Sequence, residues 1–158
     1  MRCLSTLFSL MAASLAISVP LAARAQSVKP ILDSQHYLFQ PWTAQSETGQ
    51  IHHLDDNYFT LEITPDKIIS NLPYFGRAYV APVDPTKNTL DFNSEKFTYT
   101  ITLRKKDGWI VSIKPQDDQD ITGMQLVISS NGYASLEVLF PNQEPITFNG
   151  IITHPGKP

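Results

Sequence analysis

The sequence predicts an all-β fold, a single-domain antiparallel barrel or curved sandwich of about nine short strands. Apolar residues recur with a period of two along most of residues 26–158, as in strands that bury one face. The 12 prolines and 7 glycines suit short elements separated by turns. A chain of 158 residues that is 42% hydrophobic and 17% charged can form one domain with its own core. No window of residues 26–158 shows a convincing helical stripe, so no helix is expected.

Residues 1–25 are predicted to be a cleaved signal peptide. Arg2 precedes an uncharged apolar stretch, and Ala23-Arg24-Ala25 fits the small-x-small pattern that signal peptidase cleaves. A single membrane anchor is the alternative, because this stretch approaches the ~20 residues that span a bilayer. Serines, threonines and Pro20 dilute the stretch, which favours cleavage. We therefore expect a periplasmic or secreted protein that is soluble after cleavage, with no integral membrane segment in the mature chain.

Cleavage would change the composition of the chain. Removing residues 1–25 from the 158 leaves 133 residues, with 26–35 as an N-terminal extension, 36–153 as the β-domain and 154–158 as a C-terminal tail. The only cysteine, Cys3, leaves with the signal, so no disulfide or thiol chemistry is expected. Two arginines leave as well, which takes Lys+Arg from 12 to 10 against 15 Asp+Glu and gives a net charge of −5. Nucleic-acid binders are usually basic, so no nucleic-acid partner is expected.

The first half of the β-domain has the less regular pattern. Pro41 would confine the opening strand to a sheet edge or a strand end. The polar residues 45–56 are expected to form a loop, and Thr64-Pro65-Asp66-Lys67 a turn. Residues 73–88 contain three prolines and no clear period, which predicts a long connection. Strands are predicted at residues 36–42, 58–63, 68–72 and 90–92.

The second half of the β-domain alternates more regularly, and it predicts two hairpins. Asp107-Gly108 and Asn131-Gly132 are turn sequences whose residues tolerate positive φ angles. Apolar and polar residues alternate on both sides of each turn, so one face of each strand would be buried. Strands are predicted at residues 97–104, 109–113, 122–128, 134–140 and 146–152.

The segment Leu72-Pro73-Tyr74-Phe75-Gly76-Arg77-Ala78-Tyr79 resembles the signature of the DUF4251 family, small exported proteins of Bacteroidetes. Downstream features are similar too, and the resemblance extends roughly from Tyr37 to Ile152. It implies an all-β domain and a cell-envelope location. It implies no activity and transfers no catalytic or binding residue. The similar downstream features are Leu90-Asp91-Phe92, the basic turn at Lys105-Lys106, Ala134-Ser135-Leu136 and Phe148-Asn149-Gly150.

Tyr74, Phe75, Arg77 and Tyr79 are the candidate ligand- or partner-binding residues. In a recognition surface the aromatics would give rigid contact area, and Arg77 a planar fork for a carboxylate, a phosphate or a peptide carbonyl. The alternative is a structural corner, in which the proline and Gly76 set the backbone and the aromatics cap the core. Arg77 would then pair with a buried carboxylate or stack on a ring. The structural role is the more common one for such a segment.

Two clusters contain metal-ligating residue types. His53 with Asp55, or His52 with Asp56, has a workable geometry, whereas neighbouring histidines point to opposite faces of an extended chain. A solvated polar loop is the expected role, and no metal is predicted. Asp117-Asp118-Gln119-Asp120 offers oxygen ligands but lacks the glycine and the distant glutamate of an EF-hand loop. It is expected to be a solvated turn that blunts a strand edge, with weak surface calcium binding as the alternative.

The expected function is non-enzymatic binding of a small apolar or lipid-like molecule in the cell envelope. Small barrels often hold one such ligand, here between the apolar faces of residues 97–103, 109–113 and 136–140, although a filled core is the commoner case. The second hypothesis is a protein- or peptide-interaction module of the envelope that uses residues 72–79 or an open edge strand. The third and less favoured hypothesis is an enzyme of unrecognised type. The sequence contains no hydrolase motif and no cysteine nucleophile that would mark an active site. No cofactor is predicted, and the oligomeric state is left open.

Overall fold

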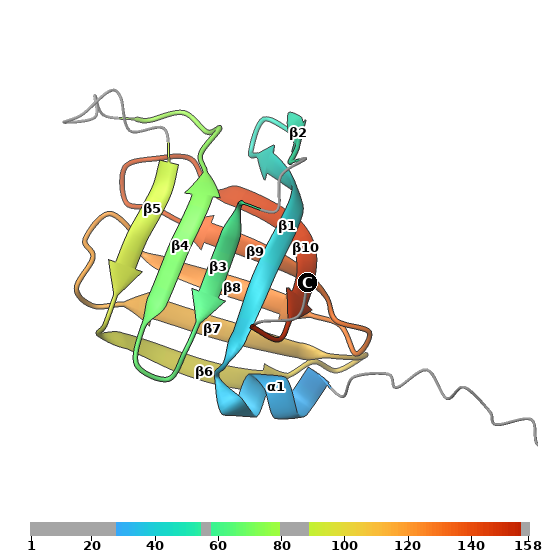
Figure 1. Ribbon diagram of the computed structural model, residues 1–158. Coiled ribbons are helices and arrows are strands. Elements are labelled where there is room, and N and C mark those ends of the chain that lie inside the picture. Colours follow the sequence, from blue (N-terminus) through green and yellow to red (C-terminus); the bar gives the residue numbers. More distant parts are fainter. Residues whose placement is uncertain (1–27, 55–57, 80–88, 156–158) are drawn as a thin grey trace, which may run out of the picture.

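A computed structural model describes residues 28–54, 58–79 and 89–155, which form one helix and ten strands. The predicted signal peptide at residues 1–25 lies outside the described residues. The elements are α1 (Val28–Ser34), β1 (Tyr37–Ser46), β2 (Ile51–His53), β3 (Thr60–Ile63), β4 (Ile68–Pro73), β5 (Thr89–Ser94), β6 (Phe97–Leu103), β7 (Trp109–Pro115), β8 (Gly123–Ile128), β9 (Tyr133–Leu139) and β10 (Ile146–Thr153) (Figure 1).

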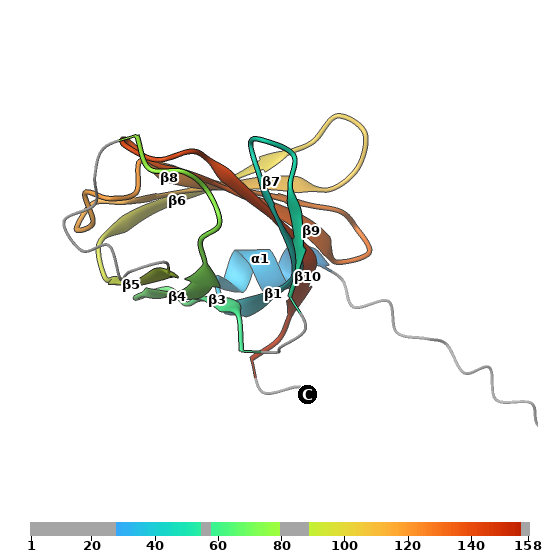
Figure 2. The same cartoon turned by 90° about the horizontal axis from the view of Figure 1, so that it is seen from above.

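The strands form one antiparallel sheet that curls into a nearly closed barrel. The strand order is β5-β4-β3-β1-β10-β9-β8-β7-β6, and β2 adds a short pairing to β1. Figures 1 and 2 show the sheet folded into two facing layers, with β5, β4, β3 and β1 in one and β6 to β10 in the other. β1 and β10 pair along most of their length and join the two layers. The predicted all-β class and antiparallel barrel are therefore confirmed.

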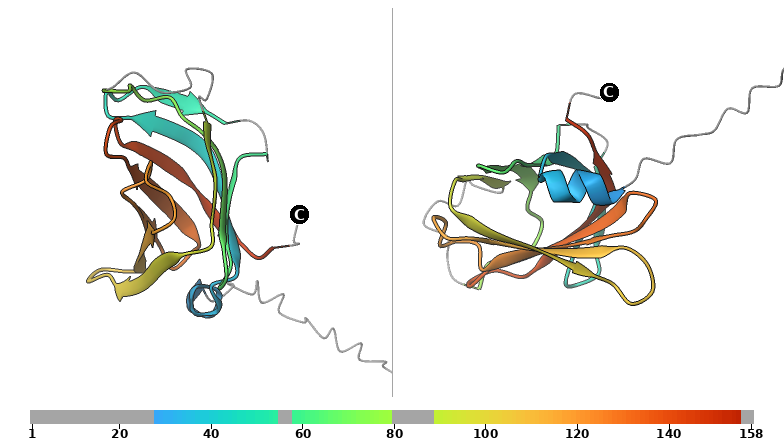
Figure 3. Two further views of the ribbon diagram at one scale, coloured as in Figure 1. Left: turned by 90° about the vertical axis from the view of Figure 1, so that its left-hand side faces the viewer. Right: turned by 90° about the horizontal axis from the view of Figure 1, so that it is seen from below.

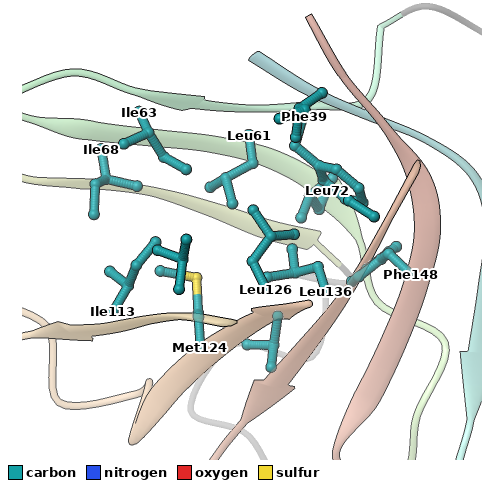
Figure 4. Close-up of a cluster of buried hydrophobic side chains, with 14 of the residues drawn as sticks. Phe39, Leu61, Ile63, Ile68, Leu72, Ile113, Met124, Leu126, Leu136 and Phe148 are labelled. Carbon is teal, nitrogen blue, oxygen red and sulfur yellow. The ribbon is translucent and has the colours of Figure 1, made fainter. Parts of the chain in front are cut away.

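The interior of the barrel is filled with side chains from both layers. Figure 4 shows Phe39, Leu61 and Leu72 of one layer pointing toward Leu126 and Leu136 of the other, all at most 1% exposed. Each strand contributes alternate residues, as its sequence period of two predicts. Burial of a leucine or phenylalanine side chain stabilises the fold by about 1.5–3 kcal/mol before the entropy of ordering it is subtracted. The described residues contain no cysteine, so this core accounts for much of the cohesion of the domain.

The two hairpins of the second half have the predicted strands and faces. β6 pairs with β7, β8 with β9 and β9 with β10, all antiparallel. Gly108 and Gly132 have φ angles of +92° and +89°. The preceding Asp107 and Asn131 are not among the residues with positive φ, so only the glycine of each pair takes the left-handed conformation.

The expectation of no helix is wrong at α1. This helix has seven residues, and its buried side chains Val28, Ile31 and Leu32 have the i, i+3, i+4 spacing of one helical face. Two turns are too short to produce a periodic stripe over a window of 11–18 residues. Pro30 is tolerated because amide groups in the first turn of a helix have no intrahelical partner. In the part of the chain that the structure describes, no helix is long and apolar enough to cross a membrane.

α1 lies across one end of the barrel, where it covers the space between the layers (Figure 3). The Tyr99 hydroxyl from β6 donates to the Leu32 carbonyl at 3.3 Å and lies 3.1 Å from the Tyr37 hydroxyl of β1. Burial is the main cause that raises the pKa of Tyr99 to about 12, and it raises the pKa of Tyr37 well above the usual value. Both tyrosines therefore stay neutral at physiological pH and connect the helix to both layers.

Pro41 is not at a sheet edge or strand end, contrary to the sequence prediction. It lies inside β1, which pairs with β10 on one side and with β3 and β2 on the other. The register with β10 shifts between Pro41 and Thr43, so that Trp42 is the extra residue of a β-bulge. On the other side of β1, β3 pairs only as far as Phe39 and β2 pairs from Thr43 onward. Pro41 therefore occupies a gap in the ladder, where its missing N–H leaves no partner unsatisfied.

The expected loop at residues 45–56 is partly wrong as well. β1 continues to Ser46, and β2 returns beside it with His52 opposite Ala44 and Ile51 opposite Gln45. Gly49, at a φ of +83°, makes the tight connection between the two strands. The sequence did not predict this hairpin because β2 is not buried, so its residues show no alternation of apolar and polar side chains.

A candidate recognition platform on the 74–79 segment

The 74–79 segment leaves β4 and pairs with the loop between β9 and β10. The Glu144 amide donates to the Arg77 carbonyl at 2.9 Å, and the Tyr79 amide donates to the Asn142 carbonyl at 2.9 Å. Ala78 and Gln143 form an antiparallel bridge between these two contacts. Backbone hydrogen bonds thus fix this segment on the loop between β9 and β10. The segment lies within residues 73–88, which the sequence predicts to be a long connection.

The buried side chain of Tyr74 fixes the start of the segment. This side chain is 6% exposed, and its hydroxyl donates to the Glu144 carbonyl at 2.9 Å and also lies within hydrogen-bond distance of the Arg77 carbonyl, at 3.2 Å. Its ring packs edge-on against Phe140, with 5.3 Å between the ring centroids. Burial, followed by the nearby Glu144 carboxylate, raises the pKa of Tyr74 to about 12. The hydroxyl therefore remains a proton donor throughout the physiological range.

Glu144 is a buried acid that the sequence analysis did not identify as part of this site. Its side chain Oε2 accepts a hydrogen bond from the Arg77 backbone amide at 3.2 Å, and the residue is 8% exposed. The predicted structural corner thus includes a buried carboxylate, but the backbone of Arg77 binds it rather than the guanidinium. In the sequence Glu144 lies among polar loop residues with no periodic pattern, which explains why no signal distinguished it.

The Arg77, Phe75 and Tyr79 side chains face outward. Phe75 is 38% exposed and Tyr79 64% exposed, and Arg77 is exposed too. Among the described residues, no carboxylate lies within ion-pair distance of the Arg77 guanidinium. The four predicted residues therefore divide into two roles, because Tyr74 holds the segment while the other three present their side chains. We call Phe75, Arg77 and Tyr79 together the recognition platform.

His52 of β2 supports the platform from the neighbouring hairpin. Its ring stacks on Phe75 with 4.0 Å between the centroids and 10° between the planes. The Phe75 ring is therefore held on one face and open on the other. This contact gives His52 a packing role that the sequence analysis did not foresee.

The candidate metal ligands near His52 are only partly described. His53 is paired with Thr43 of β1, whereas Asp55 and Asp56 lie outside the described residues. Within the residues that the structure describes, no three His, Cys, Asp or Glu side chains gather as a metal site would require.

Asp117 has a structural role that the predicted solvated turn did not include. Its carboxylate reaches from the loop between β7 and β8 to the turn between β5 and β6. It accepts hydrogen bonds from the Ser94 hydroxyl at 2.5 Å and from the Glu95 and Lys96 amides at 2.8 and 3.0 Å. The Ser94 hydrogen bond is the main cause that lowers the pKa of Asp117. Asp117 therefore secures the turn between the two terminal strands of the sheet order.

Of the three apolar faces expected to line a cavity, those of residues 109–113 and 136–140 belong to the filled core, whereas residues 97–103 are partly buried or exposed. Val111, Ile113, Leu136 and Val138 are at most 2% exposed and pack within one cluster. Two hollows in the described part of the chain are open to solvent. One, of about 520 Å³, lies beside the end of α1 and is lined by Phe97 and Tyr99 with polar residues of three turns. The other, of about 290 Å³, lies on the outer face of the sheet.

The chain is similar to proteins of one family. The family model described as "Domain of unknown function (DUF4251)" matches residues 21–152. A crystal structure of a DUF4251 family protein from Bacteroides eggerthii DSM 20697 superposes with a TM-score of 0.60 and 12% sequence identity. The match covers 82% of this chain and 87% of that chain, and it supports the fold. No curated protein matches the sequence.

Proposed function

Since this chain belongs to the DUF4251 family, a domain of unknown function, we propose its role from its own surface. It is a non-enzymatic protein- or peptide-interaction module, and it binds its partner through the recognition platform. The resemblance drawn from residues 72–79 is confirmed by the family match. The same residues now suggest what the segment is for.

The observation that carries the proposal is that exposed side chains stand on a rigid support. Tyr74, Glu144 and two backbone hydrogen bonds hold the segment, while Phe75, Arg77 and Tyr79 remain exposed. Aromatic residues and arginine dominate the binding energy of protein interfaces. A prearranged surface also loses less conformational entropy on binding. A segment needed only as a corner would not require these three exposed side chains.

The chemistry of the platform favours a partner with an acidic residue beside an aromatic or apolar one. The Arg77 guanidinium can bind a carboxylate through two parallel hydrogen bonds. The open face of Phe75 and the exposed Tyr79 ring would contact the neighbouring apolar group. We therefore expect short acidic-aromatic sequences to bind.

A small apolar or lipid-like ligand is the second candidate. Its place would be the hollow beside α1, which Phe97 and Tyr99 line. The same hollow is lined by Asp66, Glu95 and Lys96, and charged groups around an apolar ligand lose hydration without compensation. The platform therefore has the stronger support. Native mass spectrometry of the purified protein tests this second candidate, because a bound lipid would add a discrete mass.

The proposed location is the periplasm or the extracellular space. The support is the apolar stretch of residues 1–25 with its small-x-small end at Ala25. Mass spectrometry of the intact protein from the periplasmic or secreted fraction should give the mass of a chain that begins at Gln26. A full-length chain in the membrane fraction would instead indicate an uncleaved anchor.

A peptide-display selection tests the interaction. A library of random peptides is selected against the wild-type protein, and the recovered peptides are assayed with Phe75→Ala, Arg77→Ala and Tyr79→Ala. We expect acidic-aromatic peptides whose affinity falls about 10-fold or more in each variant. Lys114→Ala, which removes an exposed cation on β7, serves as the matched control and should bind normally.

Thermal unfolding of the same variants separates recognition from structure. The side chain of Arg77 is exposed, so Arg77→Ala should unfold within about 0.5 kcal/mol of the wild type. A large loss of stability without a change in peptide affinity would mark Arg77 as structural. Selected peptides that bind all three platform variants as tightly as wild type would refute the proposal.

A further inference from the structure

On the outer face of the sheet, the rings of Trp42 and Tyr133 meet above β10. Trp42 comes from β1 and Tyr133 from β9, the two strands that flank β10 in the sheet. The rings pack edge to face with 5.7 Å between centroids and 85° between planes. They are nevertheless 42% and 55% exposed. Two large aromatic side chains thus stay open to solvent although the core lies directly behind them.

Both rings are held by the backbone that carries them. Trp42 is the extra residue of the β1 bulge, and its carbonyl accepts a hydrogen bond from the Leu54 amide at 2.9 Å. Tyr133 follows the Asn131-Gly132 turn, and its amide donates to the Asn131 side chain at 3.2 Å. Trp42 shares the outer face of β1 with Leu38 and Gln40, and the bulge shifts the alternation after it, so that Ala44 returns to the core.

Both rings line the hollow of about 290 Å³ on this face. The small residues Ala134 and Gly150 line it too, and Asn149, Arg104 and Ser135 contribute polar groups. Asn149 is held in place by a hydrogen bond from its amide to the Thr43 hydroxyl at 3.4 Å. The volume is at the lower end of the range for small-molecule sites, which suits a ligand of about one ring.

The composition of this hollow selects among ligand classes. A purely apolar ligand would cover the amide of Asn149 and the guanidinium of Arg104 without giving them hydrogen bonds. A peptide could not extend the sheet here, because β10 and β9 are paired on both sides. A sugar ring has C–H groups on one face and hydroxyls around its edge. An aromatic ring for the C–H face, with an amide, a guanidinium and a hydroxyl in the same lining, matches both parts.

We therefore infer that this hollow is a saccharide-binding site. One ring of the perpendicular Trp42–Tyr133 pair contacts the C–H face of a pyranose ring and the other meets the edge of that sugar, while Asn149, Arg104 and Ser135 bind its hydroxyl groups. The site is independent of the recognition platform, because it uses other strands and other residues. It would give the protein contact with a glycan in addition to a protein partner.

Nuclear magnetic resonance tests the inference, since the two tryptophans of the chain give separate indole N–H signals. Labelled protein is titrated with a hexose, an N-acetylhexosamine and a hexuronic acid, each up to about 50 mM, a range that detects millimolar dissociation constants. At least one sugar should shift the Trp42 indole and the Asn149 amide. The Trp109 indole on β7, which does not line the hollow, should stay in place.

Variants decide whether the shift reports this site. Trp42→Ala and Arg104→Ala should each weaken the sugar about 10-fold, and Arg104 lies outside the bulge, so its loss leaves the bulge intact. Tyr58→Ala removes an aromatic ring that is 78% exposed elsewhere and should change nothing. The inference is overturned if none of the sugars shifts the Trp42 indole, if Arg104→Ala and Trp42→Ala bind sugar normally, or if only detergents or peptides produce the shift.

Discussion

The glycine at position 76 shows how closely the 74–79 segment is packed. Its φ angle is not in the left-handed region, so the backbone conformation does not require glycine. A Cβ atom there would instead overlap the Tyr74 hydroxyl and lie 2.6 Å from the Tyr74 Cζ atom. The sequence analysis attributed Gly76 to backbone freedom, whereas the structure shows that it makes room for a folded-back ring.

Gly76→Ala is expected to destabilise the protein by about 1–3 kcal/mol, the usual effect of forcing an extra atom into a packed site. Urea unfolding followed by circular dichroism measures the change. Gly123→Ala is the matched control, because its nearest atom would be the Ile113 carbonyl oxygen at an ordinary 3.5 Å. Equal stability of the two variants would show that the Tyr74 ring moves aside without cost.

Asp117 makes the stability of the β5–β6 turn depend on pH. Hydrogen bonds from Ser94, Glu95 and Lys96 favour its ionised form and hold its pKa below the usual 3.8. A carboxyl whose pKa is lower in the folded state than in the unfolded chain stabilises the fold above the unfolded value. That contribution disappears as the pH falls through the folded value.

Wild type should therefore be more stable than Asp117→Asn at about pH 7, and the difference should shrink between about pH 4 and pH 2. Melting temperatures of both proteins across this range measure the difference. Asp118→Asn is the control, since among the described residues the Asp118 carboxylate bonds only within its own loop, to the Asp120 amide. A constant gap between wild type and Asp117→Asn would mean that the carboxylate charge does not matter.

At the scale of elements, α1 closes one end of the barrel. Its buried side chains, Val28, Ile31 and Leu32, are at most 4% exposed, and each would be worth about 1.5–3 kcal/mol if fully transferred from water. Ordering the helix costs conformational entropy, which offsets part of this gain. The helix is short, but its apolar face belongs to the core of the barrel.

A chain that starts at His36 should lose at least about 2 kcal/mol of stability relative to one that starts at Val28. It should also bind the dye ANS, because removal of the helix uncovers the apolar end of the barrel. Chemical denaturation and ANS fluorescence provide the two measurements. If the shorter chain matched the longer one in both, α1 would be a surface attachment and no part of the core.

Strands of the second half could be predicted from the sequence because their residues alternate over five or more positions. The structure confirms these strands and the buried residues Leu126, Leu136 and Phe148. Two elements could not be predicted because they lack such a pattern. α1 spans only two turns, and the β1–β2 hairpin is polar because it stands beyond the core.

The candidate site, like the fold, could be predicted from the sequence only in part. A compact run of aromatics, glycine and arginine identified Tyr74, Phe75, Arg77 and Tyr79 for attention. Its division into a buried anchor and an exposed platform depended on Glu144, which is 70 residues away from Tyr74 in the sequence. Contacts between distant segments arise from the pairing of the loops in three dimensions, and a single sequence contains no local pattern for them.

For the molecule as a whole, the junction of β1 with β10 decides whether the two layers form one barrel. Gly150 lies opposite Pro41 in this pairing, and the backbones approach so closely that a Cβ on Gly150 would lie 2.7 Å from the Pro41 Cα atom. It would also overlap the Gln40 carbonyl oxygen. Unlike a side chain, this backbone cannot rotate away.

Gly150→Ala is accordingly expected to cost more than Gly76→Ala, about 3 kcal/mol or more, and to reduce the folded fraction at 37 °C. Urea unfolding of both variants under the same conditions measures the order. A Gly150→Ala protein as stable as the Gly123→Ala control would show that the β1 bulge can open to admit the methyl group.

The pairing of Leu38 with Thr153 also determines when this chain can fold. β1, the first strand, pairs with β10, the last strand. The two layers therefore cannot join until almost the whole β-domain has been synthesised. Closing such a long loop is slow compared with forming a local hairpin. A nascent chain of this design therefore leaves the ribosome before its two layers are joined.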